Sequence, residues 1–215
     1  MGNAKVVDGS HWTDVVDMTK IKANGVDAFI AKCGQGETEV DPTFLWKANH
    51  ALEAGMVPGA YYWLSPTGDP LVMANHCASL IKTFGKPMLV AIDIEWNKAT
   101  DGSEEWSKLT LAQRVVLIRT FLNCLKTMVT GRILLYLPPE FAREALPGVD
   151  LSDLDLWTVD YNASHVEPEL PPHFTTWAFR QRSGTDLEPG ELTPDDLDEF
   201  NGPPEGLSAF LCEAV

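Results

Sequence analysis

The stretch MLVAIDIEW, residues 88–96, decides how the rest of the chain is interpreted. Its first five residues are all apolar, and a continuous apolar run is typical of a parallel strand covered on both faces. Asp93 and Glu95 come next, separated by one isoleucine. Because side chains alternate along a strand, the two carboxylates leave on the same side, about 6.5–7 Å apart. The sequence therefore predicts a buried strand that ends in two carboxylates sharing one small volume.

Two carboxylates in one small volume have a chemical consequence. Their mutual repulsion raises the pKa of one of them, and Trp96 could add an apolar wall, so one acid can keep its proton near neutral pH while the other is ionised. Such a pair is suited to splitting a glycosidic bond. The alternative is that both acids only cap the loop after the strand.

Strand-like and helix-like patterns alternate along the chain. Apolar runs predict strands at residues 4–8, 27–32, 57–63, 88–93, 132–136, 154–161 and 174–181. Helical periodicity or helix start and stop signals predict helices at residues 14–23, 41–55, 70–84 and 109–128. This alternation is typical of parallel β-α-β units with right-handed crossovers.

The residues at the carboxyl ends of the strands distinguish an open sheet from a barrel. An open sheet that binds a nucleotide carries a Gly-rich phosphate turn, and Gly34-Gln35-Gly36 lacks the third glycine. A barrel instead gathers polar groups at the carboxyl ends of many strands. Such groups here are Asp8, Lys32, Tyr61, Asp93, Glu95, Tyr136, Asp160 and Gln181. The convergence favours a barrel.

Composition excludes several classes of partner. The net charge is −15, and the residues after Arg182 include nine acids and no Lys or Arg, so we expect neither nucleic acid nor an anionic membrane as a partner. At 215 residues one domain is expected, most simply a monomer. The start of the chain has no apolar segment typical of a signal peptide, which predicts synthesis in the cytoplasm.

The cysteines and histidines predict no bound group. The four cysteines, Cys33, Cys77, Cys124 and Cys212, are widely scattered, and the five histidines show no metal-ligand spacing. This fits reduced, mostly buried thiols better than a disulfide framework or a zinc site. We therefore expect neither a metal nor a cofactor.

Several short motifs, in order, resemble glycoside hydrolase family 25, the lysozymes or N-acetylmuramidases. They are Val7-Asp8 with Trp12; residues 28–32 with Gly36; Asp41-Pro42-x-Phe44; residues 54–61; Asp93-x-Glu95; Tyr136; Leu156-Trp157 through Tyr161; Gln181; and Asp196-Leu197-x-x-Phe200-Asn201-Gly202. The resemblance implies an α/β fold, an irregular, flattened, TIM-like β/α barrel. It also implies one catalytic domain over residues 1–215, without a separate wall-binding domain. The activity implied is hydrolysis of the β-1,4 bond between N-acetylmuramic acid and N-acetylglucosamine in bacterial peptidoglycan.

The resemblance also assigns roles to four acids. Glu95 matches the general acid/base, and Asp93 matches the partner that stabilises the intermediate, an oxazolinium formed by the substrate's own 2-acetamido group or a covalent adduct. Asp8 and Asp196 match acids that line the groove. From the residues alone, Asp8 could be a turn residue, and Asp196 could cap a helix that begins near Thr193.

A further set of side chains is expected to bind substrate. Sugar rings stack on aromatic faces, and several aromatics at one barrel end favour a glycan groove, although they could simply belong to the core. The predicted substrate-binding residues are Tyr61, Trp63, Tyr136, Trp157, Tyr161, Gln181 and Lys32. Gln35 departs from the family pattern, because many relatives have a glutamate after the lysine of the second strand.

Three functions are compatible with the sequence. The first is an active muramidase, most simply a phage endolysin that is made in the host cytoplasm and acts on the cell wall. The second is a catalytically weak glycan-binding or virion structural module with the same barrel. The third is a glycosidase that acts on another glycan.

Overall fold

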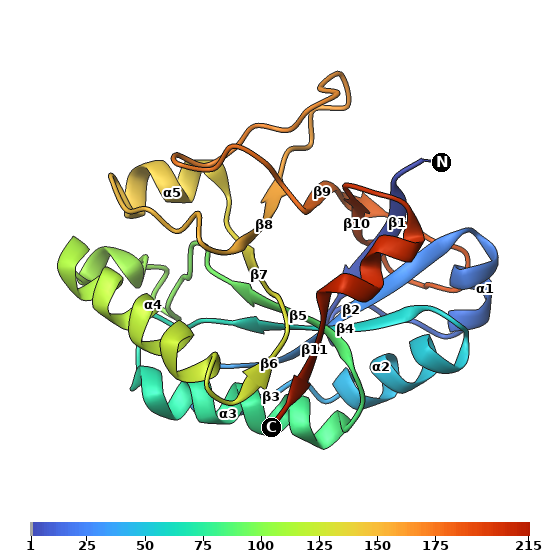
Figure 1. Ribbon diagram of the computed structural model, residues 1–215, viewed down its shortest axis with the longest axis horizontal. Coiled ribbons are helices and arrows are strands. Elements are labelled where there is room, and N and C mark those ends of the chain that lie inside the picture. The colour runs from blue at the N-terminus through green and yellow to red at the C-terminus, as the bar shows by residue number, and fades with distance from the viewer. Residues whose placement is uncertain (1) are drawn as a thin grey trace.

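The computed structural model describes residues 2–215, and within them eight strands close into a barrel (Figure 1). In pairing order the strands are β1 (Ala4–Gly9), β2 (Val26–Gln35), β4 (Val57–Trp63), β5 (Met88–Asp93), β7 (Ile133–Tyr136), β8 (Asp155–Val159), β9 (Phe179–Asp186) and β10 (Asp195–Phe200). β10 runs antiparallel to both of its neighbours, whereas the other neighbouring pairs are parallel. The predicted single-domain α/β barrel is confirmed, and it is a mixed barrel.

Helices cover the outside of the first half of the barrel. They are α1 (Met18–Ala23), α2 (Phe44–Glu53), α3 (Pro70–Phe84), α4 (Leu111–Leu125) and α5 (Pro139–Ala145), with 3₁₀ segments η1 (Trp106–Lys108) and η2 (Pro204–Phe210). Figure 1 shows α2, α3 and α4 together along one side, while the chain after β8 runs in long loops on the other side. None of the helices in residues 2–215 combines the length and the apolar character of a bilayer-spanning segment.

Three short strands lie outside the ring. β3 (Glu39–Val40) forms a hairpin with the end of β2, and β11 (Leu211–Ala214) pairs with both β5 and β6 (Val129–Thr130). β11 meets β5 at Met88 and Leu89, the first residues of that strand. The end of the chain is therefore fixed at the face of the barrel opposite the carboxyl end of β5.

The core consists of two apolar clusters. One fills the space between the barrel and its helices, and the other lies inside the barrel. The inner cluster takes alternate strand residues, among them Val6, Ile30, Ala91 and Leu134. Side chains two positions further along each strand point inward again, one layer higher. Alternation thus lifts the residues at positions 8, 32, 93 and 136 to the carboxyl-end mouth of the barrel.

Some element boundaries were predicted wrongly. Only residues 18–23 of the predicted helix 14–23 are helical, because Val15 forms a β-bridge with Glu191 and Gly190 O accepts hydrogen bonds from the next two backbone N–H groups. Asp17 then caps the helix by accepting from the backbone N–H groups of residues 19 and 20. Helix 41–55 begins at Phe44, helix 109–128 is limited to residues 111–125, and α5 was not predicted.

The last part of the chain departs most from prediction. The strand predicted at residues 174–181 begins instead at Phe179 and continues to Asp186. The alternative interpretation of Thr193 as a helix start does not hold, because residues 195–200 form β10. The Thr193 hydroxyl accepts a hydrogen bond from the backbone N–H of Asp14 at 2.7 Å instead. Asp196 therefore does not cap a helix.

Candidate active site

A pocket opens at the carboxyl ends of the parallel strands. It is lined by Asp8, Tyr61, Trp63, Asp93, Glu95, Tyr136, Trp157, Tyr161, Gln181 and Asp196. Of the side chains singled out as catalytic or substrate-binding, Lys32 does not line it. The Lys32 ammonium lies beside the pocket, 4.9 Å from the centre of the Trp63 ring, and donates to Gln35 Oε1 at 2.7 Å. The amide that departs from the family pattern is thus a direct partner of this lysine.

The two carboxyls after the buried run of β5 are both in the pocket. Asp93 is the last residue of β5 and is buried, and its Oδ1 has no hydrogen-bond partner among the described residues. Burial, followed by repulsion from Glu95, raises the pKa of Asp93 well above its usual value. Glu95 is less buried, and burial together with the charge of Asp196 raises its pKa to about 7, against the opposing effect of Lys32. A proton can therefore remain on Glu95 near neutral pH.

Trp96 does not form the apolar wall expected from the sequence. Its ring packs edge-on against Phe141 of α5, with ring centroids 4.8 Å apart, within the cluster between barrel and helices. The walls that remove water from Glu95 are instead the side chains of the pocket itself. The raised pKa was predicted correctly from neighbouring charge and burial, but the residue named as the source of burial was wrong.

Asp8 and Asp196 lie directly opposite each other on the antiparallel pair β1 and β10. Because β10 runs antiparallel, its first residues stand at the same end of the barrel as the last residues of β1. Burial raises the pKa of Asp196 to about 6. Asp8 is almost fully buried, and burial together with nearby acids raises its pKa well above the usual range. Asp8 is therefore a pocket residue rather than a turn residue.

Gln181 connects three pocket side chains. The hydroxyls of Tyr136 and Tyr161 donate to its Oε1 at 2.9 and 2.8 Å. Its Nε2 donates to Asp8 Oδ2 at 3.2 Å. Since two hydroxyl donors occupy the amide oxygen, the amide nitrogen faces Asp8. Gln181 thus holds the two tyrosines and Asp8 in fixed relative positions.

Trp157 forms the floor of the pocket. It is 2% exposed, and its ring packs edge-on against Tyr136 at 5.2 Å. Its Nε1 donates to Asp198 Oδ1 at 2.8 Å. A ring so deeply buried supports its neighbours more than it offers a face for stacking, whereas Tyr161, with 56% of its surface exposed, presents an accessible ring.

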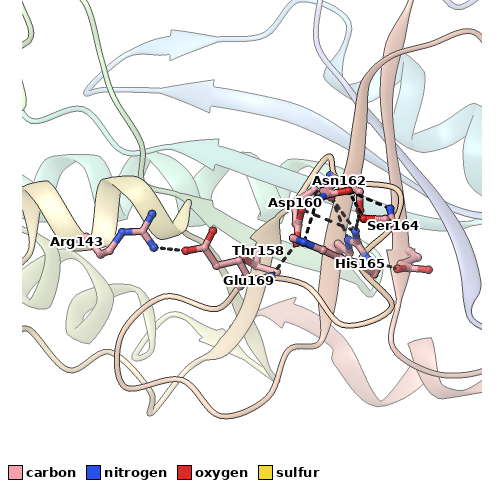
Figure 2. A network of polar contacts seen from close by, with 9 residues as sticks. Arg143, Thr158, Asp160, Asn162, Ser164, His165 and Glu169 are labelled. Atoms are coloured by element: carbon pink, nitrogen blue, oxygen red, sulfur yellow. Dashed lines mark hydrogen bonds and ion pairs between the residues drawn. The ribbon is translucent and has the colours of Figure 1, made fainter.

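Asp160 lies at a strand end, as the sequence suggested, but does not line the pocket. Figure 2 shows it within a network of the loop after β8. Asp160 Oδ2 lies 2.7 Å from His165 Nδ1 and accepts from the backbone N–H of Glu169. The buried Arg180 donates to the carbonyl oxygens of residues 160, 162 and 165. This network fixes the loop that carries Tyr161 into the pocket.

Comparison with known proteins places the chain in a family. The sequence profile of the Glycosyl hydrolases family 25 matches residues 7–189. The chain belongs to glycosyl hydrolase family 25. It is therefore a glycoside hydrolase.

Individual relatives of this family 25 enzyme are distant in sequence and close in fold. Lysozyme M1 of Streptomyces globisporus is 24% identical over 210 residues, which cover 95% of this chain and 70% of the relative. A bacterial lysozyme from Streptomyces coelicolor superposes with a TM-score of 0.86 at 23% identity, covering 98% and 97% of the two chains. A muramidase from Acremonium alcalophilum gives 0.82 at 21% identity, covering 96% and 98%. The structural matches show a shared fold.

Sequence reasoning missed Asp195 and Asp198, two buried acids on β10 of the family 25 enzyme that lie next to the groove acid Asp196. Asp198 contacts Trp157 and Asp8, and Asp195 Oδ1 accepts from Thr13 Oγ1 at 3.0 Å. In a strand, Asp196 and Asp198 share one face. If residues 195–200 had been interpreted as a strand, Asp198 would have been placed on the same face as Asp196. The sequence of the stretch resembles a helix start instead.

A second hollow adjoins the pocket. It is lined by Gly9, Ser10, Trp12, Thr13, Tyr61, Gly184, Pro194, Asp195 and Asp196, so it shares Tyr61 and Asp196 with the pocket. Trp12 is 79% exposed. A Cβ at Gly9 would come within 2.5 Å of Asp195 Oδ2, so a larger residue there would displace the Asp195 carboxyl. The glycoside hydrolase thus has a wider groove than the pocket alone.

Proposed function

We propose that the protein is a muramidase that hydrolyses the β-1,4 bond between N-acetylmuramic acid and N-acetylglucosamine in bacterial peptidoglycan. The observation that carries the proposal is Glu95, a carboxyl with a pKa of about 7, beside the buried Asp93 in a pocket lined by acids and aromatic rings. Membership of family 25 and similarity to a lysozyme support the choice of peptidoglycan over other glycans.

The proposed first step is bond cleavage with acid assistance. Glu95 donates its proton to the glycosidic oxygen, the bond between C1 and that oxygen breaks, and the sugar's 2-acetamido oxygen bonds to C1. Asp93 as a carboxylate stabilises the resulting positive charge. Two neighbouring carboxyls of raised pKa keep one proton between them near neutral pH. In the reacting complex we assign that proton to Glu95, because Glu95 is the more exposed of the two and is therefore the one that a glycosidic oxygen can reach.

The proposed second step is hydrolysis of the intermediate. Glu95, now a carboxylate, takes a proton from water while the water oxygen bonds to C1 and the acetamido oxygen leaves. Glu95 is thereby protonated again. A covalent adduct on Asp93 is the alternative route, and trapping the intermediate with a substrate that lacks the 2-acetamido group distinguishes the two.

Groove residues are proposed to position the sugar. Tyr61 and Tyr161 offer ring surface, and Gln181 and Asp8 offer polar atoms within the same pocket. Lys32 acts from beside the pocket by lowering the pKa of both Glu95 and Asp93. The partner is thus a glycan strand, bound by stacking and hydrogen bonds.

Digestion of purified peptidoglycan, with product analysis by mass spectrometry and the Glu95→Gln variant as control, tests the proposal. A muramidase leaves muramic acid at the new reducing ends. Glucosamine at the new reducing ends would contradict the bond assigned. Tight binding of peptidoglycan with no release of product by the wild-type protein would favour a binding module instead.

The finer assignment, a phage endolysin for host lysis, stays a prediction. It is tested by producing the protein inside bacteria whose purified wall it cleaves, with and without a pore-forming phage protein. We expect lysis only when the pore is present. Intact cells despite the pore would contradict a lysis role while leaving the muramidase proposal in place.

A further inference from the structure

Two buried carboxyls meet beneath the pocket. Asp8 on β1 and Asp198 on β10 are 4% and 1% exposed, and their carboxyls lie close enough to share a hydrogen bond once one of them is protonated. The register explains the contact: Asp198 lies opposite Val6, one inward-facing position below Asp8. Asp198 therefore sits between the pocket and the apolar cluster inside the barrel.

The contact requires a proton. Asp198 Oδ1 accepts from Trp157 Nε1, while Asp198 Oδ2 has no donor among the described residues. Two ionised carboxylates hold only acceptors, so a hydrogen bond between them exists only when one carries a proton. A buried oxygen without a donor is costly. One proton shared between Asp8 and Asp198 gives Asp198 Oδ2 the hydrogen-bond donor that it otherwise lacks.

The partners decide where that proton lies. Asp198 accepts from Trp157 Nε1 at 2.8 Å, whereas Asp8 accepts from Gln181 Nε2 at 3.2 Å, so the shorter hydrogen bond favours the ionised form of Asp198. Asp8 Oδ2 accepts from Gln181, which leaves its other oxygen to donate. We propose that Asp198 is a positioning residue of the active site, which accepts a hydrogen bond from Asp8 and so holds Asp8 in the pocket as a neutral acid.

The consequence concerns the charge beside Glu95. A neutral Asp8 adds no negative charge to the pocket, where burial and the charge of Asp196 already raise the pKa of Glu95. The titratable groups around the pair on every neighbouring strand are Asp195 and Asp196 on β10, Asp93 and Glu95 at the end of β5, Lys32 on β2, and Tyr61, Tyr136 and Tyr161. Most of these groups are acids. An ionised Asp8 would add one more negative charge to them, and its repulsion would raise the pKa of Glu95 further.

The protonation of Asp8 can be measured without substrate. We expect the carboxyl-carbon NMR signal of Asp8, in protein labelled with ¹³C-aspartate and assigned by its loss in Asp8→Asn, to show a neutral acid at pH 6. In Asp198→Asn an amide N–H faces Asp8, so the Asp8 signal should become that of a carboxylate. An ionised Asp8 in the wild-type protein at pH 6 would overturn the inference.

The kinetic test rests on the proposed muramidase reaction. In Asp198→Asn the negative charge moves from below the floor to Asp8, which is nearer Glu95, so the alkaline limb of kcat/KM should shift to higher pH by about one unit. Glu191→Gln is the matched control, because Glu191 is also buried, has a raised pKa of about 7, and lines neither the pocket nor the second hollow. The control variant should leave the alkaline limb of kcat/KM at the wild-type pH.

The two tests fail differently. An unmoved limb in Asp198→Asn, with activity lost only in proportion to folded protein, would reduce Asp198 to a structural residue. Absence of muramidase activity in the wild-type protein would remove the kinetic test and contradict the proposed function, but the NMR result would still decide the proton's position.

Discussion

The two halves of the barrel supply different parts of the site. Residues 4–136 contain parallel strands separated by helices, and they place Asp93 and Glu95 at the end of β5, which is paired on both sides along its length. Residues 155–200 contain β8, β9 and the antiparallel β10, joined without helices, and they supply Tyr161, Gln181 and Asp196. The residues proposed to transfer the proton thus lie in the regular half, whereas Asp196, whose charge raises the pKa of Glu95, lies in the irregular half. Chemistry that needs fixed geometry is best carried by rigid elements, whereas loops can vary.

The largest effect is expected in the regular half. Glu95→Gln should reduce turnover by about 10²–10⁴-fold or more, because a general acid/base is lost, while folding and substrate binding remain. Asp93→Asn should be nearly as severe. A turbidity assay on cell walls, with circular dichroism as the folding control, measures this. A wild-type rate for Glu95→Gln would refute the role assigned to it.

Buried acids in both halves should make stability depend on pH, and several of them lie in the irregular half. Burial raises the pKa of Glu191 to about 7, of Asp195 to about 8 and of Asp196 to about 6. Raised values mean that the folded protein holds these protons more tightly than the unfolded chain, so this stability is full below about pH 4 and is lost as pH rises through 6 to 8. We expect the Tm to fall by about 5 °C between pH 5 and pH 9.

A matched pair of variants tests whether the buried acids cause the fall of Tm with pH. Asp195→Asn should flatten the fall of Tm with pH, whereas substitution of the exposed Glu205 by Gln should not. A Tm that rises between pH 5 and pH 9 would show that other groups dominate.

Asp196→Asn should have an intermediate effect, of about tenfold on kcat/KM. Removing a negative charge from crowded acids should leave stability unchanged or higher. The pKa of Glu95 should fall, so that the alkaline limb shifts to lower pH, opposite to the shift expected for Asp198→Asn. Rates across pH, together with Tm, measure both effects. Lost stability with intact activity would move Asp196 out of the site.

The smallest effect is expected at Trp12, in the second hollow beside the pocket. Trp12→Ala should raise KM severalfold for long glycan strands and leave kcat unchanged, since an exposed aromatic ring beside the pocket contributes stacking only. Trp46→Ala is the control, because Trp46 is also exposed but lies on α2 and stacks on His50. Equal KM values for both variants would limit the groove to the pocket.

Sequence prediction succeeded where local signals agreed with the fold. Residues 70–84 form a helix as predicted, because Asp69 accepts from the backbone N–H of Leu71 at its start and Gly85 adopts a positive φ of 69° at its end. The strands at 57–63 and 88–93 were also predicted correctly, since apolar runs match burial on both faces. The pocket lining could be inferred from the carboxyl ends of such strands.

Prediction failed where inward-facing residues are polar. The sequence of β10, DDLDEF, lacks the apolar alternation of a strand because Asp196 and Asp198 face the polar end of the barrel interior. The preceding Thr-Pro pair imitates a helix start, and only pairing with β1 and β9 overrides that local preference. Asp195 and Asp198 were missed for the same reason, because their environment is created by strands far away in sequence.

The pairing of β1 with β10 also sets the order in which activity can arise during synthesis. Asp8 and Asp196 face each other although they come from opposite ends of the chain, and contacts of such wide sequence separation form late in folding. A ribosome-bound chain that has not released residues 195–200 carries Asp93 and Glu95 but no closed ring around them. We therefore expect a chain that ends before β10 to lack both the closed ring and the part of the pocket lining that Asp196 supplies, and so to be inactive.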